Sequence, residues 1–203
     1  MAIRIAWKAM PRKGLVGSSP TSSARYMQNF IKALKISLQN KNWYSALFIA
    51  LSLPDICGGL ENPTLGSEKR YVLWFNKYLN SYYTRGIGPH GQHVVTFLSG
   101  EDCYALRCSF LHEGRDEITD QRCQKVLNNF RFTTDLSHMN YIDNGTNKTL
   151  QLQVKQFCEE ISTGTEEWLK DVKSNQDIQK EITKMLKIHD SIFTKDDTGY
   201  HIP

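Results

Sequence analysis

An arginine and a histidine five residues apart, Arg107 and His112, are the side chains of this sequence best suited to catalysis. Both lie in residues 100–114, the segment densest in reactive groups. Histidine titrates near neutral pH and can move a proton, whereas a guanidinium group stays charged and can bind two phosphate oxygens at once. Cleavage of RNA without a metal needs both, because the attacking 2′-hydroxyl loses a proton while charge builds on the phosphoryl oxygens. These two residue types are therefore the pair needed for RNA cleavage without a metal.

The segment that carries this pair has the pattern of one short helix. Ser99 begins a Ser-Gly-Glu-Asp run, which is typical of a helix start, and Gly114 is suited to end the helix. On such a helix Arg107 and His112 are about 140° apart around the axis and about 7.5 Å apart along it. They do not share one face, so a neighbouring helix or a second subunit must cover the space between them to form one cleft.

The run Arg107-Cys-Ser-Phe-Leu-His112 is an R-x4-H motif late in a helical domain, and it resembles the signature of HEPN domains. The resemblance covers residues 26–190 as topology and only this run as motif. It implies a HEPN-like antiparallel helical bundle and a metal-independent endoribonuclease, which needs no cofactor and leaves 2′,3′-cyclic phosphate ends. It also implies a homodimer with two paired sites, and a place in phage defence or a toxin–antitoxin system beside an antitoxin or defence-system partner. The sequence departs from the family at Cys108, where Asn, Asp or His is common.

Three acidic residues could support the pair, and each also has a structural interpretation. Asp55 follows Pro54 at an expected helix junction, so it either caps a helix or orients Arg107 from a neighbouring helix. Glu101 and Asp102 suit the first turn of a helix, where acidic side chains interact favourably with the helix dipole. Their alternative role is that of catalytic acids.

The pair itself also has a purely structural interpretation. A bundle helix often carries one arginine in a surface ion pair, here with Glu101 or Glu113, and a histidine near the C-terminus of a helix is favoured by the dipole. The protein would then be a catalytically silent helical module that binds a partner protein. The two interpretations differ in whether Arg107 and His112 converge on a concave, solvent-reachable site or point into separate surroundings.

The cysteines and remaining histidines form no recognisable metal motif. The five cysteines are irregularly spaced without a CxxC pair, and Cys103, Cys108 and His112 would face different sides of one helix. Cys108 has the spacing of a nucleophile with His112 as its base, but no oxyanion hole is recognisable. Reduced thiols favour a cytoplasmic location. His90 and His93 fall in a glycine-rich loop and are expected to be solvated.

Composition indicates one folded domain that does not coat nucleic acid. The chain has 203 residues, of which 40% are hydrophobic and 23% charged, which is enough apolar surface for a core. Residues 1–25 hold five basic and no acidic side chains, and the other 178 hold 20 basic and 21 acidic ones. Any bound RNA must therefore be held by a local patch. The longest apolar run, residues 46–53, is too short to span a membrane.

The first 25 residues differ from the rest and have two interpretations. They are a disordered basic segment, or they result from a misannotated start, because residues 16–21 can be encoded by a sequence typical of a tRNA T-arm. The domain then covers residues 26–190, followed by a polar tail at 191–203.

Hydrophobic periodicity predicts a mainly α fold, a helical bundle with a small β-hairpin inserted in its C-terminal half. The expected helices are residues 26–38, 43–53, 68–83, 99–113, 123–128, 154–172 and 176–189, with a loop at 86–91. The expected strands are residues 130–134, 139–142 and 149–154, with a tight turn at 143–145. Aromatic residues at helical spacing, among them Trp43, Trp74, Phe75 and Tyr78, are expected in the core.

Overall fold

The computed structural model describes residues 20–118 and 124–188, which are mainly helical with two small sheets. The helices are α1 Pro20–Gln39, α2 Trp43–Glu61, α3 Ser67–Tyr78, α4 Asn80–Tyr83, the 3-10 turn η1 Pro89–Gly91, α5 Gly100–Glu113, α6 Val154–Asp171 and α7 Gln176–Thr183. The strands are β1 Thr84–Ile87, β2 His93–Thr96, β3 Asn129–Thr133, β4 Asn140–Asp143 and β5 Lys148–Gln153. Helix α1 begins inside the segment 1–25 that was predicted to be disordered. The predictions for residues 1–19 and for the tail 191–203 lie outside the described residues.

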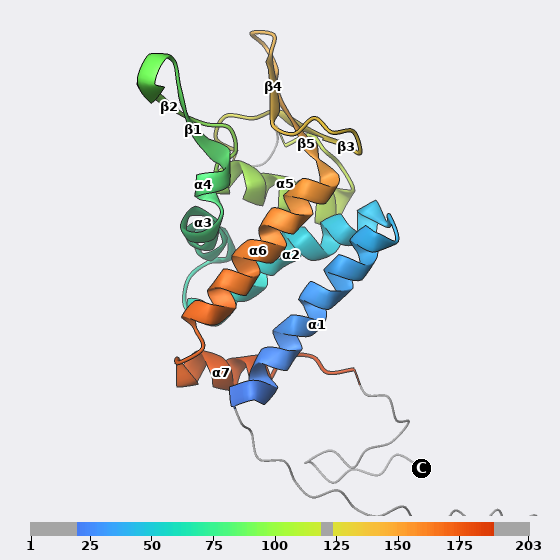
Figure 1. The fold of residues 1–203 in the computed structure, drawn as a ribbon, viewed down its shortest axis with the longest axis vertical. Coiled ribbons are helices and arrows are strands. Elements are labelled where there is room, and N and C mark those ends of the chain that lie inside the picture. Colours follow the sequence, from blue (N-terminus) through green and yellow to red (C-terminus); the bar gives the residue numbers. More distant parts are fainter. Residues whose placement is uncertain (1–19, 119–123, 189–203) are drawn as a thin grey trace, which may run out of the picture.

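Helix α2 is the central element of the bundle (Figure 1). It contacts α1, α3, α5, α6 and α7. Helices α1 and α6 lie side by side across it, α7 closes one end, and the two sheets lie toward the other end. The largest fully buried side chains, which fill the space between these helices, include Trp168, Tyr71, Tyr83, Phe75 and Phe157.

Helix α2 continues through Pro54, which corrects the prediction that this proline ends or kinks the element. Asn42 caps its start by accepting a hydrogen bond from the backbone N–H of Ser45, and the helix then runs to Glu61. Pro54 cannot donate the usual backbone hydrogen bond. It is nonetheless buried beside Leu53, which is fully buried, so packing outweighs the lost bond. Asp55 is therefore an interior helical residue and not a helix cap.

By length and composition alone, α2 is the one helix in the described part of the chain that could cross a membrane. The prediction that no segment could span a membrane considered only the uninterrupted apolar run at residues 46–53, whereas the helix extends from Trp43 to Glu61. The helix contacts five other helices and carries the charged Asp55. Those contacts favour the core helix of a water-soluble protein.

Two glycines in α2 allow α3 to approach closely. A Cβ atom on Gly58 would lie 2.6 Å from the backbone oxygen of Arg70, and one on Gly59 would lie 3.3 Å from the Arg70 guanidinium carbon. No side chain fits at position 58 unless the backbone moves. This close packing sets Arg70 of α3 against the C-terminal part of α2.

The C-terminal sheet contains the predicted hairpin and one further strand pairing. β4 and β5 form the expected antiparallel hairpin around residues 143–145, and β3 pairs in parallel with the other edge of β5. Phe130 of β3 lies opposite Leu150 of β5, and both are buried. The sheet is thus anchored to the core through one face.

Several other predictions were wrong. The glycine-rich loop is instead part of the β1–β2 hairpin, in which Gly86 pairs with Val94. Residues 124–128 are not helical, because their backbone N–H groups bond to Asp102 and to Lys148. The third helix ends at Tyr78, before the short α4, and the last ends at Thr183.

Replacing Gly58 by alanine should destabilise the protein by about 1–3 kcal/mol, because the added methyl group collides with rigid backbone. The free energy of unfolding is measured by urea titration.

Gly66→Ala is the matched control. A Cβ atom at Gly66 would have no atom within 4 Å, and its φ of −60° suits alanine. Gly66 is the N-cap of α3, where alanine is less favourable than glycine, so this variant should cost at most about 0.5–1 kcal/mol. Equal stability of the two variants would contradict the close α2–α3 contact.

Candidate functional site

Helix α5 begins and ends at the predicted residues. The Ser99 side chain accepts a hydrogen bond from the backbone N–H of Asp102, and Gly114 ends the helix in the left-handed conformation with φ of 69°. The Gly114 N–H donates to the carbonyl oxygens of Phe110 and Ser109. These two caps fix the helix that carries both Arg107 and His112.

Arg107 and His112 converge although they do not share a helix face. The Nη1 atom of Arg107 lies 3.2 Å from Nε2 of His112, because the long arginine side chain spans the angle between them. A guanidinium group can only donate hydrogen bonds, so His112 Nε2 is the acceptor in this contact. A hydrogen bond of this kind requires the tautomer that carries its proton on Nδ1. Its acceptor atom faces the arginine.

Asp55 of α2 anchors the arginine from the other side. Its Oδ2 atom accepts a hydrogen bond from Arg107 Nη2 at 2.8 Å, and its Oδ1 atom binds Arg70 through Nε at 3.0 Å and Nη2 at 2.9 Å. The side chains of Asp55, Arg107 and Arg70 are 13%, 20% and 27% exposed. Two guanidinium groups on one carboxylate leave a net positive charge at this place on the surface. Of the two roles considered for Asp55, the geometry fits the one that orients Arg107.

Tyr104 and Cys108 lie between Arg107 and His112 on the helix surface. The Arg107 guanidinium carbon is 5.9 Å from the centroid of the Tyr104 ring, and Nη1 is 3.9 Å from Cys108 Sγ. The Tyr104 hydroxyl is held by Ser67 Oγ at 2.7 Å. Burial alone would lower the pKa of Arg107, but Cys108, Asp55 and Tyr104 together raise it above the ordinary value. The guanidinium therefore stays charged.

The ends of the Arg107 side chain differ in their surroundings. Its Nε atom is buried without a hydrogen-bond partner in the described residues, whereas Nη1 and Nη2 have the contacts above. His112 is exposed to solvent. An incoming anion can thus reach the Nη1–His112 side of the cluster, opposite the face fixed by Asp55.

Glu101 and Asp102 do not join the pair. Asp102 is 1% exposed, and its carboxylate accepts hydrogen bonds from Ser99 Oγ and from the backbone N–H groups of residues 125–127. Glu101 pairs with exposed Lys125 at 3.5 Å. Both lie more than two turns before His112, about 15 Å or more along the helix axis. Asp102 therefore ties the chain after residue 123 to the start of α5.

The described cysteines are free thiols, and Cys103 is separated from the pair. It is fully buried and lies 3.3 Å from the Tyr71 hydroxyl, and burial raises its pKa to about 12. It does not face Cys108 or His112 as a shared metal ligand would. No cluster of three or more His, Cys, Asp or Glu side chains suited to a metal occurs within residues 20–118 and 124–188.

Arg70 is the site residue that the sequence did not reveal. Its only local signal is the glycine pair at residues 58–59, which permits a close approach but does not say by which side chain. Of the aromatic residues expected in the core, Trp74, Phe75 and Tyr78 are buried, whereas Trp43 is half-buried and lines a cavity. His90 and His93 are exposed as expected, but in the β1–β2 hairpin.

Comparison of the whole chain with protein-family models, with curated proteins and with solved structures finds no match. The geometry of this site is therefore the basis on which a function can be assigned.

Asp55→Asn should destabilise the protein by about 1–3 kcal/mol, because two half-buried guanidinium groups then lose their shared counter-charge. Urea unfolding measures the change.

Glu101→Gln is the matched control, because it also replaces a carboxylate by the corresponding amide. It removes a carboxylate whose partner, Lys125, is 57% exposed, so the cost should stay below about 0.5 kcal/mol. A similar small cost for Asp55→Asn would show that Asp55 does not hold the two arginines in solution.

Proposed function

We propose that this protein is a metal-independent endoribonuclease of HEPN type, with Arg107 and His112 as its catalytic residues. The observation that carries the proposal is the 3.2 Å contact between Arg107 Nη1 and His112 Nε2, with the arginine anchored by Asp55. A charge donor and an imidazole at one solvent-exposed place are the two groups that this reaction needs.

The reaction needs only groups of this kind. An RNA phosphate binds the Nη1 side of the Arg107 guanidinium, which faces away from Asp55. This displaces the contact between Nη1 and His112. His112 Nε2 then accepts the proton of the 2′-hydroxyl, whose oxygen bonds to phosphorus as the bond to the 5′-oxygen breaks. The products are a 2′,3′-cyclic phosphate and a 5′-hydroxyl. Asp55 keeps the guanidinium oriented, and its own contacts do not change during the step.

A second subunit completes the proposed site. The leaving 5′-oxygen needs a proton, and a matching histidine from a second copy facing the first supplies it. The nuclease is therefore a homodimer that acts on RNA in the cytoplasm, with a setting in phage defence or a toxin–antitoxin system and an antitoxin or defence-system protein as partner. The free thiols described above are consistent with that compartment.

One observation favours a second candidate, a catalytically silent helical interaction module. The Asp55 carboxylate already forms ion pairs with both Arg107 and Arg70. Such a network can serve only to join the three helices that carry these residues. In that case the cluster stabilises the fold, and the exposed surface binds a partner protein.

Purified wild-type protein should cleave single-stranded RNA in the presence of EDTA and leave 2′,3′-cyclic phosphate ends. Arg107→Ala and His112→Ala should each reduce the rate at least on the order of 100-fold, the usual scale for removing a charge donor or a proton-transfer group. The double variant should be scarcely slower than either single one, because both residues act in one step.

His93→Ala is the control for the loss of an exposed histidine outside the site. It should cleave at the wild-type rate. Cleavage that persists in folded His112→Ala would remove the pair from the chemistry, and no cleavage by the wild type would favour the interaction module.

The homodimer should have about twice the chain mass of 23.4 kDa by light scattering. The physical reason is that one R-x4-H helix supplies one proton-transfer group, and the reaction uses two. A monomer at high micromolar concentration would contradict the shared site.

A further inference from the structure

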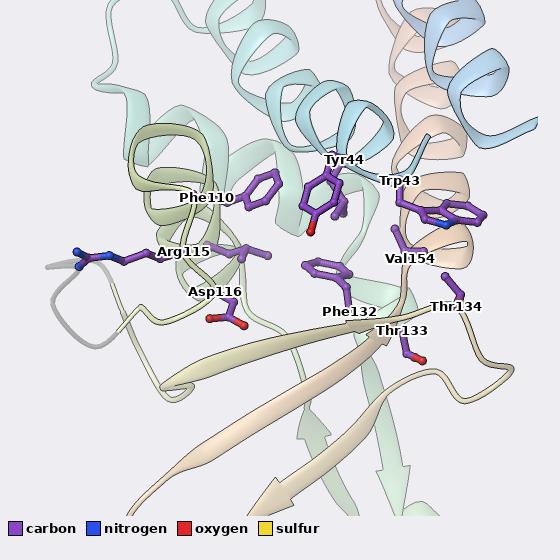
Figure 2. Close-up of a pocket in the computed structure, with 12 residues that line it drawn as sticks. Trp43, Tyr44, Phe110, Arg115, Asp116, Phe132, Thr133, Thr134 and Val154 are labelled. Atoms are coloured by element: carbon purple, nitrogen blue, oxygen red, sulfur yellow. The ribbon is translucent and has the colours of Figure 1, made fainter. Parts of the chain in front are cut away.

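A cavity of about 400 Å³ opens between the start of α2, the end of α5 and strand β3, beside the proposed catalytic helix. Figure 2 shows the ring of Phe132 opposite the rings of Tyr44 and Phe110, with the Asp116 carboxylate at one side. Its volume is in the range of small-molecule sites. None of the activity described above uses this cavity.

Aromatic rings line the cavity, and two of them pack against a second aromatic ring outside it. The Phe132 ring packs edge-on against Phe157 at 5.5 Å between centroids, and the Phe110 ring packs against Phe48 at 4.8 Å. Tyr44 is 73% exposed, so its ring is open to a ligand. A preformed set of ring faces is suited to a flat aromatic ligand.

The polar groups at the cavity distinguish a base from a phosphate. Asp116 is exposed, and no described residue donates a hydrogen bond to its carboxylate in the contacts of the structure. Residues Gly114 to Asp116 follow the C-terminus of α5, where the helix dipole is negative. Arg115 also belongs to the lining, but its side chain points away from the aromatic rings in Figure 2 and pairs with Glu113 at 3.4 Å. The Asp116 carboxylate and the helix C-terminus therefore favour N–H donors beside the rings, and a nucleobase with an amino group offers such donors.

We propose that this cavity binds an unpaired nucleobase of single-stranded RNA, with preference for a base that carries an exocyclic amino group. Single-stranded bases commonly stack on aromatic side chains and use their exposed edges for hydrogen bonds. Tyr44 and Phe132 provide the stacking faces, and Asp116 accepts a hydrogen bond from the amino group.

This inference rests on the proposed function, and α5 connects the two. Leu106 and Phe110 line the cavity. Around the helix axis Arg107 lies about 60–100° from these two residues, and His112 lies about 120–160° from them, on the far side of α5. A helix with its side chains is about 10–12 Å across. One strand that passes around the end of α5 can therefore place a base in the cavity and a nearby phosphate at Arg107.

The test measures binding without cleavage. Fluorescence anisotropy follows a labelled 2′-O-methyl oligocytidylate, which lacks the attacking hydroxyl, as it binds the wild-type full chain in EDTA. Tyr44→Ala should raise Kd on the order of tenfold, the scale of one lost base–aromatic stack. Tyr44→Phe keeps the ring and should bind as the wild type does.

Two further variants sharpen the result. Asp116→Ala should abolish the preference for 2′-O-methyl oligocytidylate over oligouridylate, because uracil has no exocyclic amino group. Tyr141→Ala is the matched aromatic control, since Tyr141 is exposed on β4 outside the cavity lining, and it should leave Kd unchanged. Circular dichroism checks that each variant is folded.

The outcomes separate this inference from the proposed function. Unchanged Kd for Tyr44→Ala, equal binding of a duplex of the same length, or no binding of any oligonucleotide overturns the base site. If Arg107→Ala and His112→Ala abolish cleavage while Tyr44→Ala binds normally, the nuclease stands and the base site falls. If binding depends on Tyr44 but the wild type does not cleave, the base site stands and the nuclease falls.

Discussion

The carboxylate of Asp55 is the interaction on which the arrangement of three helices depends. It lies in the central helix α2 and binds Arg70 of α3 and Arg107 of α5 at the same time. A poorly solvated charge is tolerated only when it is paired, and each arginine is likewise held by the shared acid. The glycines at 58–59 bring α3 close enough for this contact, and the caps of α5 place Arg107 opposite it. The orientation of the proposed catalytic arginine is thus a consequence of how the core packs.

The parts of the fold and site that could be predicted from the sequence are those with complete local signals. Ser99 and Gly114 are sufficient to define α5, and therefore to place Arg107 and His112 on one helix. The turn at residues 143–145 is likewise local, and it predicted the β4–β5 hairpin. The same signals did not determine whether Arg107 and His112 meet, because a helical wheel gives the angle between two side chains and not how far a flexible arginine reaches.

The parts that could not be predicted depend on contacts between distant segments. Pro54 normally ends a helix, but burial of the surrounding apolar residues keeps α2 continuous and makes Asp55 available to the arginines. Arg70 has no motif, since its role comes only from its position over α2. Residues 124–128 have a helical pattern, but the backbone N–H groups of residues 125–127 bond to Asp102 instead. In each case, partners far along the chain determine the conformation.

The late position of α6 in the chain affects how the protein is made. Helix α6 covers α2 and α1, with contacts such as Trp168 to Glu61 and Glu166 to Lys35, which are more than one hundred residues apart in sequence. During synthesis the most apolar helix therefore leaves the ribosome long before the surface that buries it. Contacts of such long range slow folding and leave apolar surface open to association with other chains. A chain that ends before Val154 therefore leaves exposed to solvent the face of α2 that α6 covers in the complete fold.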